Sequence, residues 1–398
     1  MAGWFHRNAR RREILRYYHR GHEHAPVLAL IRLCEALPDD PDWMDWYAAV
    51  TLWSEYYQKP LAAFTRPYGM LANSVWPMEE FDARPEAERA SWRELAREGT
   101  DLGGGWYLRA IGVHPKSPLY RGNNGTLLTQ AKALAAAAHL RGNLPAAQLC
   151  QEQLYWVLGR NPFCQSLMVG EGYDFPPMYS PRSGTIVGAL PVGIRTLGTH
   201  DLPYWPATAL CCYKEIWIHP VGRWIWLMGD MGGQPRVRGT APAGQAVTFR
   251  QVPDGLVRSA TTGPDGRFRL SLPAGVYEVT AGQARQTATL LPAGVYDLDL
   301  RPGRTVGLRI EHATVGGTVT ITLHATGIGG HRFELRAHNL AAASAIQSVD
   351  LSPARPAKLV WQAKVQDPSA PWIALITPDG DVAQRREITG LVRRPGGK

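Results

Sequence analysis

One carboxylate, Glu215, lies in the part of the sequence whose residue types best suit chemistry. Its neighbours Ile216 and Trp217 are large and apolar, and the residues around it are predicted to form a helix. Apolar surroundings favour the neutral form of a carboxylic acid. A general acid needs that form to donate a proton to a leaving oxygen. The alternative is a structural glutamate that pairs with Lys214 or Arg223.

A long segment of irregular sequence precedes this predicted helix. Residues 161–206 are rich in Gly, Pro, Tyr and Ser. Loops of that length inside a helical domain are usually functional or disordered. The aromatic content of this one favours a functional loop.

Helical patterns fill most of the chain before residue 232. Apolar residues recur at spacings of three and four over 25–37 and 45–64, which predicts amphipathic helices. The charged stretch EEFDARPEAERASWRELAREG predicts an exposed helix, and an αα-hairpin is expected around Gly142–Asn143. Six to seven helices fit in this part, so we predict that residues 1–232 are mostly helix.

The sequence pattern changes after residue 232. Short segments such as GRFRLSL and GVYEVTA alternate apolar and polar residues and are separated by PDG and PAG turn signals. Only two of the 14 Trp, Trp361 and Trp372, lie in this part. We predict a β-sandwich over 233–302, a second one over 303–398, and almost no helix.

The charge and cysteine content limit the classes of function. Lys and Arg number 43 against 34 Asp and Glu, but the excess is scattered except for a short run from Arg7 to Arg16. No nucleic-acid-binding motif accompanies that run. The five cysteines contain no C-x-x-C pair, which argues against zinc and a disulfide framework, and we expect no cofactor. No apolar run reaches the roughly 18 residues of a membrane span, and the first residues lack the apolar centre of a signal peptide.

Two segments carry a family resemblance. LGRNPFCQSLMVGEG resembles the part of glycoside hydrolase family 9 that has the pattern L-G-x-N-P followed by S-[FY]-V-x-G-[FY]-G, and the match extends loosely over residues 10–230. Glu215 and the IWIHPVGRWIWLM that follows are similar to the family's last helix, which opens with its acid glutamate. Residues 233–302 look like a carboxypeptidase regulatory-like (transthyretin-like) sandwich. The residues that carry the first match are Leu158, Gly159, Asn161, Pro162, Ser166, Val169, Gly170 and Gly172.

This resemblance implies a fold, a reaction and a site. The fold would be an all-α (α/α)6-barrel-like helical domain, incomplete here, followed by all-β sandwich modules. The reaction would be inverting hydrolysis of a β-linked glucan or related polysaccharide, with Glu215 as the general acid. Arg182 would bind a sugar hydroxyl, and Tyr179, Tyr204 and Trp205 would offer flat aromatic faces to the sugar rings. The polysaccharide is the only partner expected, and the full-length enzyme would be secreted or periplasmic.

The sequence also departs from the family's pattern. The histidine that the family places before the arginine is absent from MYSPRSG, and no D-A-G-D-like motif supplies the base; the Asp101–Gly104 string comes too late in the chain. We therefore expect an amino-truncated piece of a longer enzyme that hydrolyses glycans weakly or not at all.

Two other functions stay open. One is a non-catalytic carbohydrate-binding or surface protein that keeps the helical domain as a scaffold. The other is a polysaccharide lyase, for which Tyr179, His200 and Arg182 would supply the base and the cation.

Overall fold

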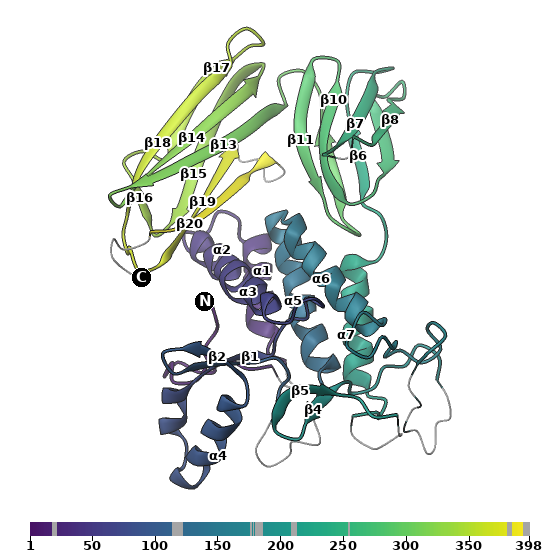
Figure 1. Cartoon of the computed structure of the whole chain (residues 1–398). Coiled ribbons are helices and arrows are strands. Elements are labelled where there is room, and N and C mark those ends of the chain that lie inside the picture. The colour runs from purple at the N-terminus through teal and green to yellow at the C-terminus, as the bar shows by residue number, and fades with distance from the viewer. Residues whose placement is uncertain are drawn as a thin grey trace. The chain divides into compact units, whose positions relative to one another are not determined.

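The chain forms two compact units in the computed structural model (Figure 1). The first unit comprises residues Met1–Ala36, Ala49–Leu140 and Pro145–Gly232, and the second comprises Leu37–Ala48, Arg141–Leu144 and Gly233–Lys398. The residues that the structure describes are 1–17, 22–113, 122–175, 177, 179, 186–207, 213–253, 255–379 and 384–392.

Seven α-helices occur in the described part of residues 1–232. They are α1 (Ala25–Ala36), α2 (Trp43–Leu52), α3 (Lys59–Ala63), α4 (Glu86–Arg97), α5 (Asn124–Arg141), α6 (Leu144–Val157) and α7 (Ile218–Met231). A π-helix, η1 (Trp53–Gln58), connects α2 to α3, and a 3-10 helix, η2 (Met78–Ala83), precedes α4. The predicted αα-hairpin is confirmed: α5 and α6 are joined at Gly142, whose φ of 63° suits glycine.

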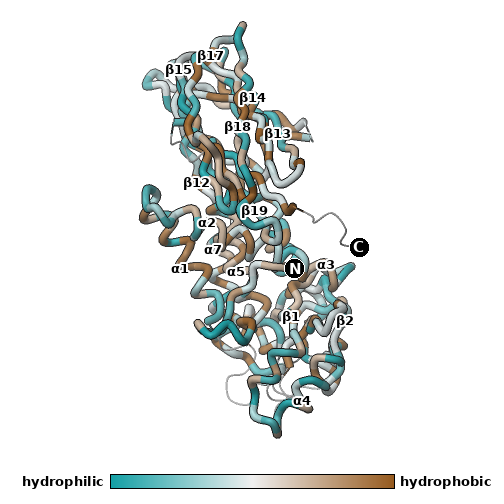
Figure 2. The backbone as a smooth tube through the Cα atoms, turned by 90° about the vertical axis from the view of Figure 1, so that its left-hand side faces the viewer, coloured by the Kyte–Doolittle hydropathy of each residue, from teal (hydrophilic) through white to brown (hydrophobic). Residues whose placement is uncertain are grey.

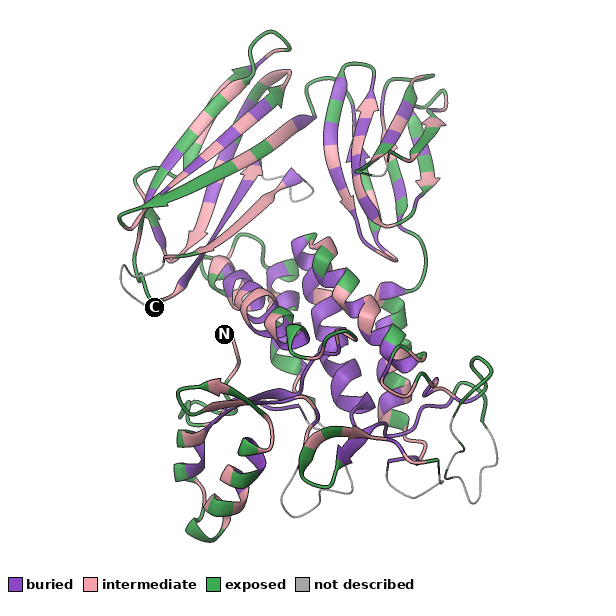
Figure 3. Cartoon of the chain, in the orientation of Figure 1, coloured by how far each residue is buried: buried purple, intermediate pink, exposed green. Residues whose placement is uncertain are grey.

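Helix α5 forms the middle of the first unit's core. Its sequence is rich in Ala and Leu, and most of its residues are buried (Figure 3). Buried residues fall on every side of this helix, so other segments have to cover every side of it. The helices and loops of the first unit provide that cover.

The predicted all-α (α/α)6-barrel fold is wrong. A three-stranded antiparallel sheet, in the order β1 (Ser74–Pro77), β3 (Trp106–Arg109), β2 (Thr100–Gly103), and a two-stranded sheet of β4 (Arg195–Leu197) and β5 (His200–Tyr204) lie among the helices. Helices do not make up most of the described residues before 232, and sheets lie among them, so that prediction is also wrong. For β2 and β3, the physical reason lies in Gly103, Gly104 and Gly105. All three adopt positive φ and turn β2 back onto β3, where a helix cannot form.

Two sheets cover one core in the first half of the β region. One sheet has the order β11-β10-β7-β8 and the other has the order β12-β6-β9. Every second residue of β10 is buried, which places Tyr277 and Val279 in a core with Phe249 and Phe268. The strands are β6 (Arg236–Thr240), β7 (Ala246–Val252), β8 (Val257–Thr261), β9 (Arg267–Ser271), β10 (Gly275–Ala281), β11 (Ala284–Leu290) and β12 (Val295–Asp299).

A second pair of sheets has its own core. The orders are β13-β14-β18-β16 and β17-β15-β19-β20, and both late tryptophans, Trp361 and Trp372, are buried between them. Brown and teal segments alternate along these strands (Figure 2). No α-helix occurs in the described residues after 232, as the sequence predicts. The strands are β13 (Val306–Val315), β14 (Thr318–Gly327), β15 (Gly329–His338), β16 (Leu340–Ala342), β17 (Ile346–Leu351), β18 (Ala357–Val365), β19 (Pro371–Pro378) and β20 (Arg386–Leu391).

A buried histidine in the first unit predicts a loss of stability in mild acid. Burial, followed by the nearby charges of Arg223, His22 and Lys132, lowers the pKa of His24 to about 4. Between pH 6.5 and about 4 the unfolded chain therefore binds more protons than the folded chain. We expect the free energy of unfolding to fall by about 1–3 kcal/mol as the pH drops through this window, and the contribution to be complete above pH 6.5.

The measurement is urea unfolding of the first unit at several pH values. His24→Gln should reduce the change in the free energy of unfolding between pH 6.5 and about 4. His200→Gln, which changes an exposed side chain, should leave that change as it is in the wild type. An unchanged slope in the His24→Gln variant would contradict the assignment.

Candidate functional site

Glu215 lies three residues before α7, in an extended segment, and not in the helix that the sequence predicts. Pro220 explains the difference. Proline is tolerated in the first turn of a helix but breaks a hydrogen bond in its interior, so a helix that contains Pro220 has to begin close before it. Helix α7 begins at Ile218, with Trp217 as its N-cap.

The extended segment is hydrogen-bonded on both sides. The Val192 N–H donates to the Glu215 carbonyl at 2.9 Å, and the Tyr179 N–H donates to the Lys214 carbonyl at 3.2 Å. Bridges of β type pair Tyr179 with Glu215 and Pro191 with Ile216. The backbone of Glu215 is thus fixed between two parts of the long loop.

The Glu215 carboxyl is half-buried and is oriented by an indole. The Trp217 Nε1–H donates to its Oε2 atom at 2.9 Å. No ion pair of Glu215 occurs within the described residues. Lys214 is buried: its Nζ donates to the Ala207 carbonyl at 3.2 Å, and burial lowers the pKa of its ammonium. Arg223 is also buried and feels the charge of Glu23 instead. The ion pairs considered as the alternative role of Glu215 are therefore not formed.

Two of the predicted aromatic platforms have little open surface. Trp205 is only 7% exposed, and its Nε1–H donates to the Gln165 side chain at 2.7 Å. The guanidinium of Arg195 lies 4.5 Å from the centre of the half-buried Tyr204 ring and covers one face of it. Both rings contribute to packing in this structure.

Tyr179 differs from these two rings. Its side chain is 39% exposed, and its backbone pairs directly with Glu215. Arg182, the predicted ligand of a sugar hydroxyl, lies outside the described residues. The structure thus brings together Glu215, Tyr179 and Trp217, and the binding roles of Tyr179, Tyr204, Trp205 and Arg182 stay predictions.

Asp201 is a second carboxylate near the long loop, and its bonds give it a structural role. The Ala110 and Ile111 N–H groups donate to it at 2.5 and 3.0 Å, and Arg109 lies 3.6 Å away. Burial raises the pKa of Asp201 and lowers that of Arg109. Asp201 therefore connects β5 to the residues that follow β3 through hydrogen bonds. Because both of its oxygens already accept hydrogen bonds, we do not assign it as a catalytic base.

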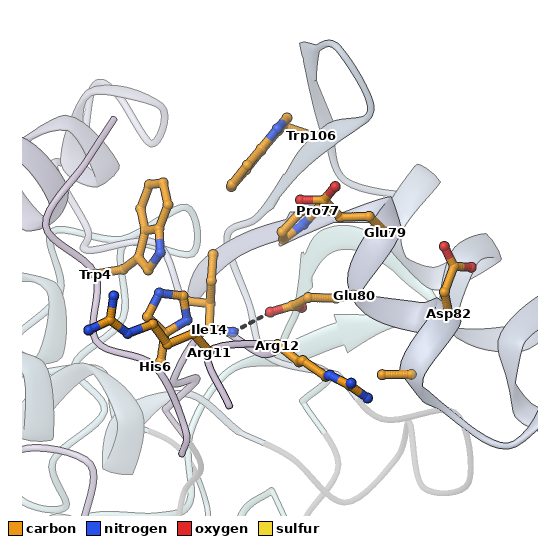
Figure 4. Close-up of a pocket in the computed structure, with 11 residues that line it drawn as sticks. Trp4, His6, Arg11, Arg12, Ile14, Pro77, Glu79, Glu80, Asp82 and Trp106 are labelled. Carbon is orange, nitrogen blue, oxygen red and sulfur yellow. Dashed lines mark hydrogen bonds between the residues drawn. The ribbon is translucent and has the colours of Figure 1, made fainter. Parts of the chain in front are cut away.

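A cavity of about 590 Å³ lies elsewhere in the first unit and shares no lining residue with the Glu215 segment. Trp4, Trp106 and Glu79 are among the residues that line it (Figure 4). No motif in the sequence marks this cavity, because its walls come from segments about 60–100 residues apart. The only signal was the concentration of tryptophan in this half of the chain.

Other features bear on the class of site. No group of three or more His, Cys, Asp or Glu side chains with the geometry of a metal site occurs among the described residues. In the same part of the chain, no helix has the length and apolar character that crossing a membrane requires.

Comparisons with known proteins give weak similarities. No family model and no curated protein matches the chain. Among solved structures, an endoglucanase, CelQ from Clostridium thermocellum complexed with cellobiose and cellotriose, is similar at 11% identity over 93% of this chain and 67% of that one, with a TM-score of 0.26. DUF3823 family proteins from Bacteroides ovatus ATCC 8483 and Bacteroides uniformis ATCC 8492 are similar at 11% and 9% identity over 40% of this chain and 100% of each of theirs, with TM-scores of 0.17. None of these similarities is strong enough to assign a fold or an activity.

Proposed function

We propose that the chain acts on a polysaccharide as a protein of the glycoside hydrolase type, with Glu215 as the proton donor. The observation that carries the proposal is the state of the Glu215 carboxyl. It is half-buried, it has no cationic partner within the described residues, and it accepts one hydrogen bond from the Trp217 indole. A glutamate with a purely structural role in such a place would be expected to form an ion pair or to point into water.

The geometry around Glu215 suits proton donation. The bond to Oε2 fixes the side chain, and Oε1 stays available to carry the proton to a glycosidic oxygen. The exposed ring of Tyr179, whose backbone pairs with that of Glu215, offers an apolar surface for a sugar ring. The sequence resemblance to family 9 supports the same role for Glu215.

Inverting hydrolysis also requires a base. In inverting enzymes the second carboxylate lies about 6.5–9.5 Å from the acid, which leaves room for a water molecule. We assign no residue of this chain to that role. A protein with this function would meet its substrate outside the cytoplasm, so we propose a secreted or periplasmic location.

The test is an assay of the purified chain on a panel of soluble β-glucans. The release of reducing ends measures turnover, and NMR of the first product identifies the anomer. Slow release of the inverted anomer supports the proposal. Binding without any turnover would favour the non-catalytic scaffold, and unsaturated products would favour a lyase.

The indole donor can be tested separately. Trp217→Phe keeps an aromatic ring and removes the N–H that holds Oε2. Because one such hydrogen bond contributes about 1 kcal/mol, we expect turnover to fall by about threefold to tenfold with little change in KM. The control is Trp224→Phe in the following helix. Equal effects of the two substitutions would mean that Trp217 acts only through packing.

A further inference from the structure

The cavity lined by Trp4 and Trp106 is built by two walls. One wall is the N-terminal hairpin of residues 5–15, in which His6 pairs with Ile14 and the Leu15 N–H donates to the Phe5 carbonyl at 2.8 Å. The other wall comes from β1, η2 and β3. The volume of the cavity, about 590 Å³, lies in the range of pockets that hold small ligands.

Two indoles form the apolar surface of this cavity. The ring centres of Trp4 and Trp106 are 5.3 Å apart, and their planes are tilted by 43°. Both side chains are half-buried. Trp4 also packs edge-on against Tyr57, and the Met78 N–H donates to the Gly105 carbonyl next to Trp106 at 2.9 Å. The rings are therefore held in place before any ligand arrives, which reduces the entropy lost on binding.

Two of the acidic side chains that η2 contributes to the cavity already have ion-pair partners. Glu80 is buried against Arg16, and Asp82 pairs with Arg93. In Figure 4, these acids lie on the right, opposite Trp4 and His6 on the left. Their charges are largely balanced by residues outside the cavity.

Three other charged side chains line the cavity and could contact a ligand. Arg11, Arg12 and Glu79 form no ion pair within the described residues. Two guanidinium groups and one carboxylate leave an excess of one positive charge. Guanidinium groups bind carboxylates in a bidentate manner, and the Glu79 carboxylate can accept hydrogen bonds from hydroxyl groups.

We propose that this cavity binds an oligosaccharide that contains a uronate ring. The C–H face of a pyranose packs on an indole, its hydroxyls suit Glu79, and the carboxylate of a uronate ring is a ligand for the guanidinium groups of Arg11 and Arg12. A planar nucleobase fits less well, because rings tilted by 43° do not form a parallel slot. This site lies apart from Glu215 and shares with the proposed function only the class of ligand.

The experiment is calorimetric titration of the full chain with three probes: trigalacturonate, the neutral β-1,4-linked glucose trisaccharide, and a nucleoside monophosphate. We expect trigalacturonate to bind at least about tenfold more tightly than the other two. Trp106→Ala and the double change Arg11→Gln, Arg12→Gln should each weaken its binding by about tenfold or more. Trp106→Phe, which keeps a ring, should weaken it less and guards against a folding defect.

Matched controls lie outside the cavity. Trp226→Ala removes a partly exposed indole of α7, and Arg32→Gln removes an exposed guanidinium of α1. Both should leave the affinity for trigalacturonate within about twofold of the wild type. Equal affinity for the neutral sugar, tighter binding of the nucleotide, no binding of trigalacturonate, or no effect of the cavity substitutions would each overturn the proposal.

Glu215→Gln separates this proposal from the proposed function. Binding of trigalacturonate to the cavity should persist in that variant, whereas any hydrolysis of a β-glucan should fall by about 10²–10⁴-fold. If Glu215→Gln abolishes binding and the cavity substitutions do not, the cavity proposal fails and the role of Glu215 stands. If binding depends on Arg11 and Arg12 while the wild-type chain hydrolyses nothing, the cavity proposal stands alone.

Discussion

Glu215→Gln is expected to lower the turnover of an unactivated β-glucan by about 10²–10⁴-fold, the usual contribution of a general acid. The amide keeps the size of the side chain and can still accept the bond from the Trp217 indole through its oxygen. It cannot supply a proton to the leaving oxygen. Folding and ligand binding should therefore be preserved, and thermal unfolding together with KM would show whether they are.

The leaving group distinguishes an acid from a structural residue. An aryl glycoside whose phenol is already a stable anion needs little protonation, so Glu215→Gln should cost far less turnover on that substrate than on the glucan. A structural defect would lower both rates equally. Equal losses on the two substrates would contradict the role of Glu215 as a general acid.

Glu80→Ala is expected to lower the free energy of unfolding of the first unit by about 3–5 kcal/mol. Glu80 is only 5% exposed and forms a buried ion pair with Arg16, and its other oxygen accepts the Ile14 N–H. The substitution leaves the Arg16 guanidinium buried without its carboxylate. It also removes the bonds that Ile14 and Arg16 make to η2 through Glu80, and leaves the ion pair of Glu13 with Arg84, 3.6 Å apart, on that side of the hairpin.

Hydrogen exchange at Ile14 and thermal unfolding measure this effect. Glu79→Ala is the matched control: its side chain is one residue away, exposed and without an ion pair in the described part of the chain, so a change within about 0.5 kcal/mol is expected. Replacing Arg16 and Glu80 together by Met and Leu should recover much of the stability, since a buried pair can be exchanged for apolar packing. A loss below about 1 kcal/mol for Glu80→Ala would mean that water reaches the pair.

The sequence by itself determined the elements whose signals are local. The apolar spacing of α1, the hairpin at Gly142 and the alternation of strands such as β10 each follow from a few neighbouring residues. The change from helix to strand near residue 232 also follows from local sequence, because the spacing of apolar residues changes there. The glycines at 103–105 and Pro220 also carried local signals, for a β-turn and for a late helix start, and these signals outweighed the helical pattern around them.

Tertiary structure alone decided which side chains are buried and which charges meet. Glu80 lies in a charged stretch that predicts an exposed helix, yet it is buried because Arg16, 64 residues away, neutralises it. Trp205 is only 7% exposed, and its indole N–H donates to Gln165, 40 residues away in the sequence. The pair of Trp4 and Trp106 exists only because the hairpin and β3 meet in space. Burial and charge pairing depend on contacts between distant segments, and local periodicity contains no information about them.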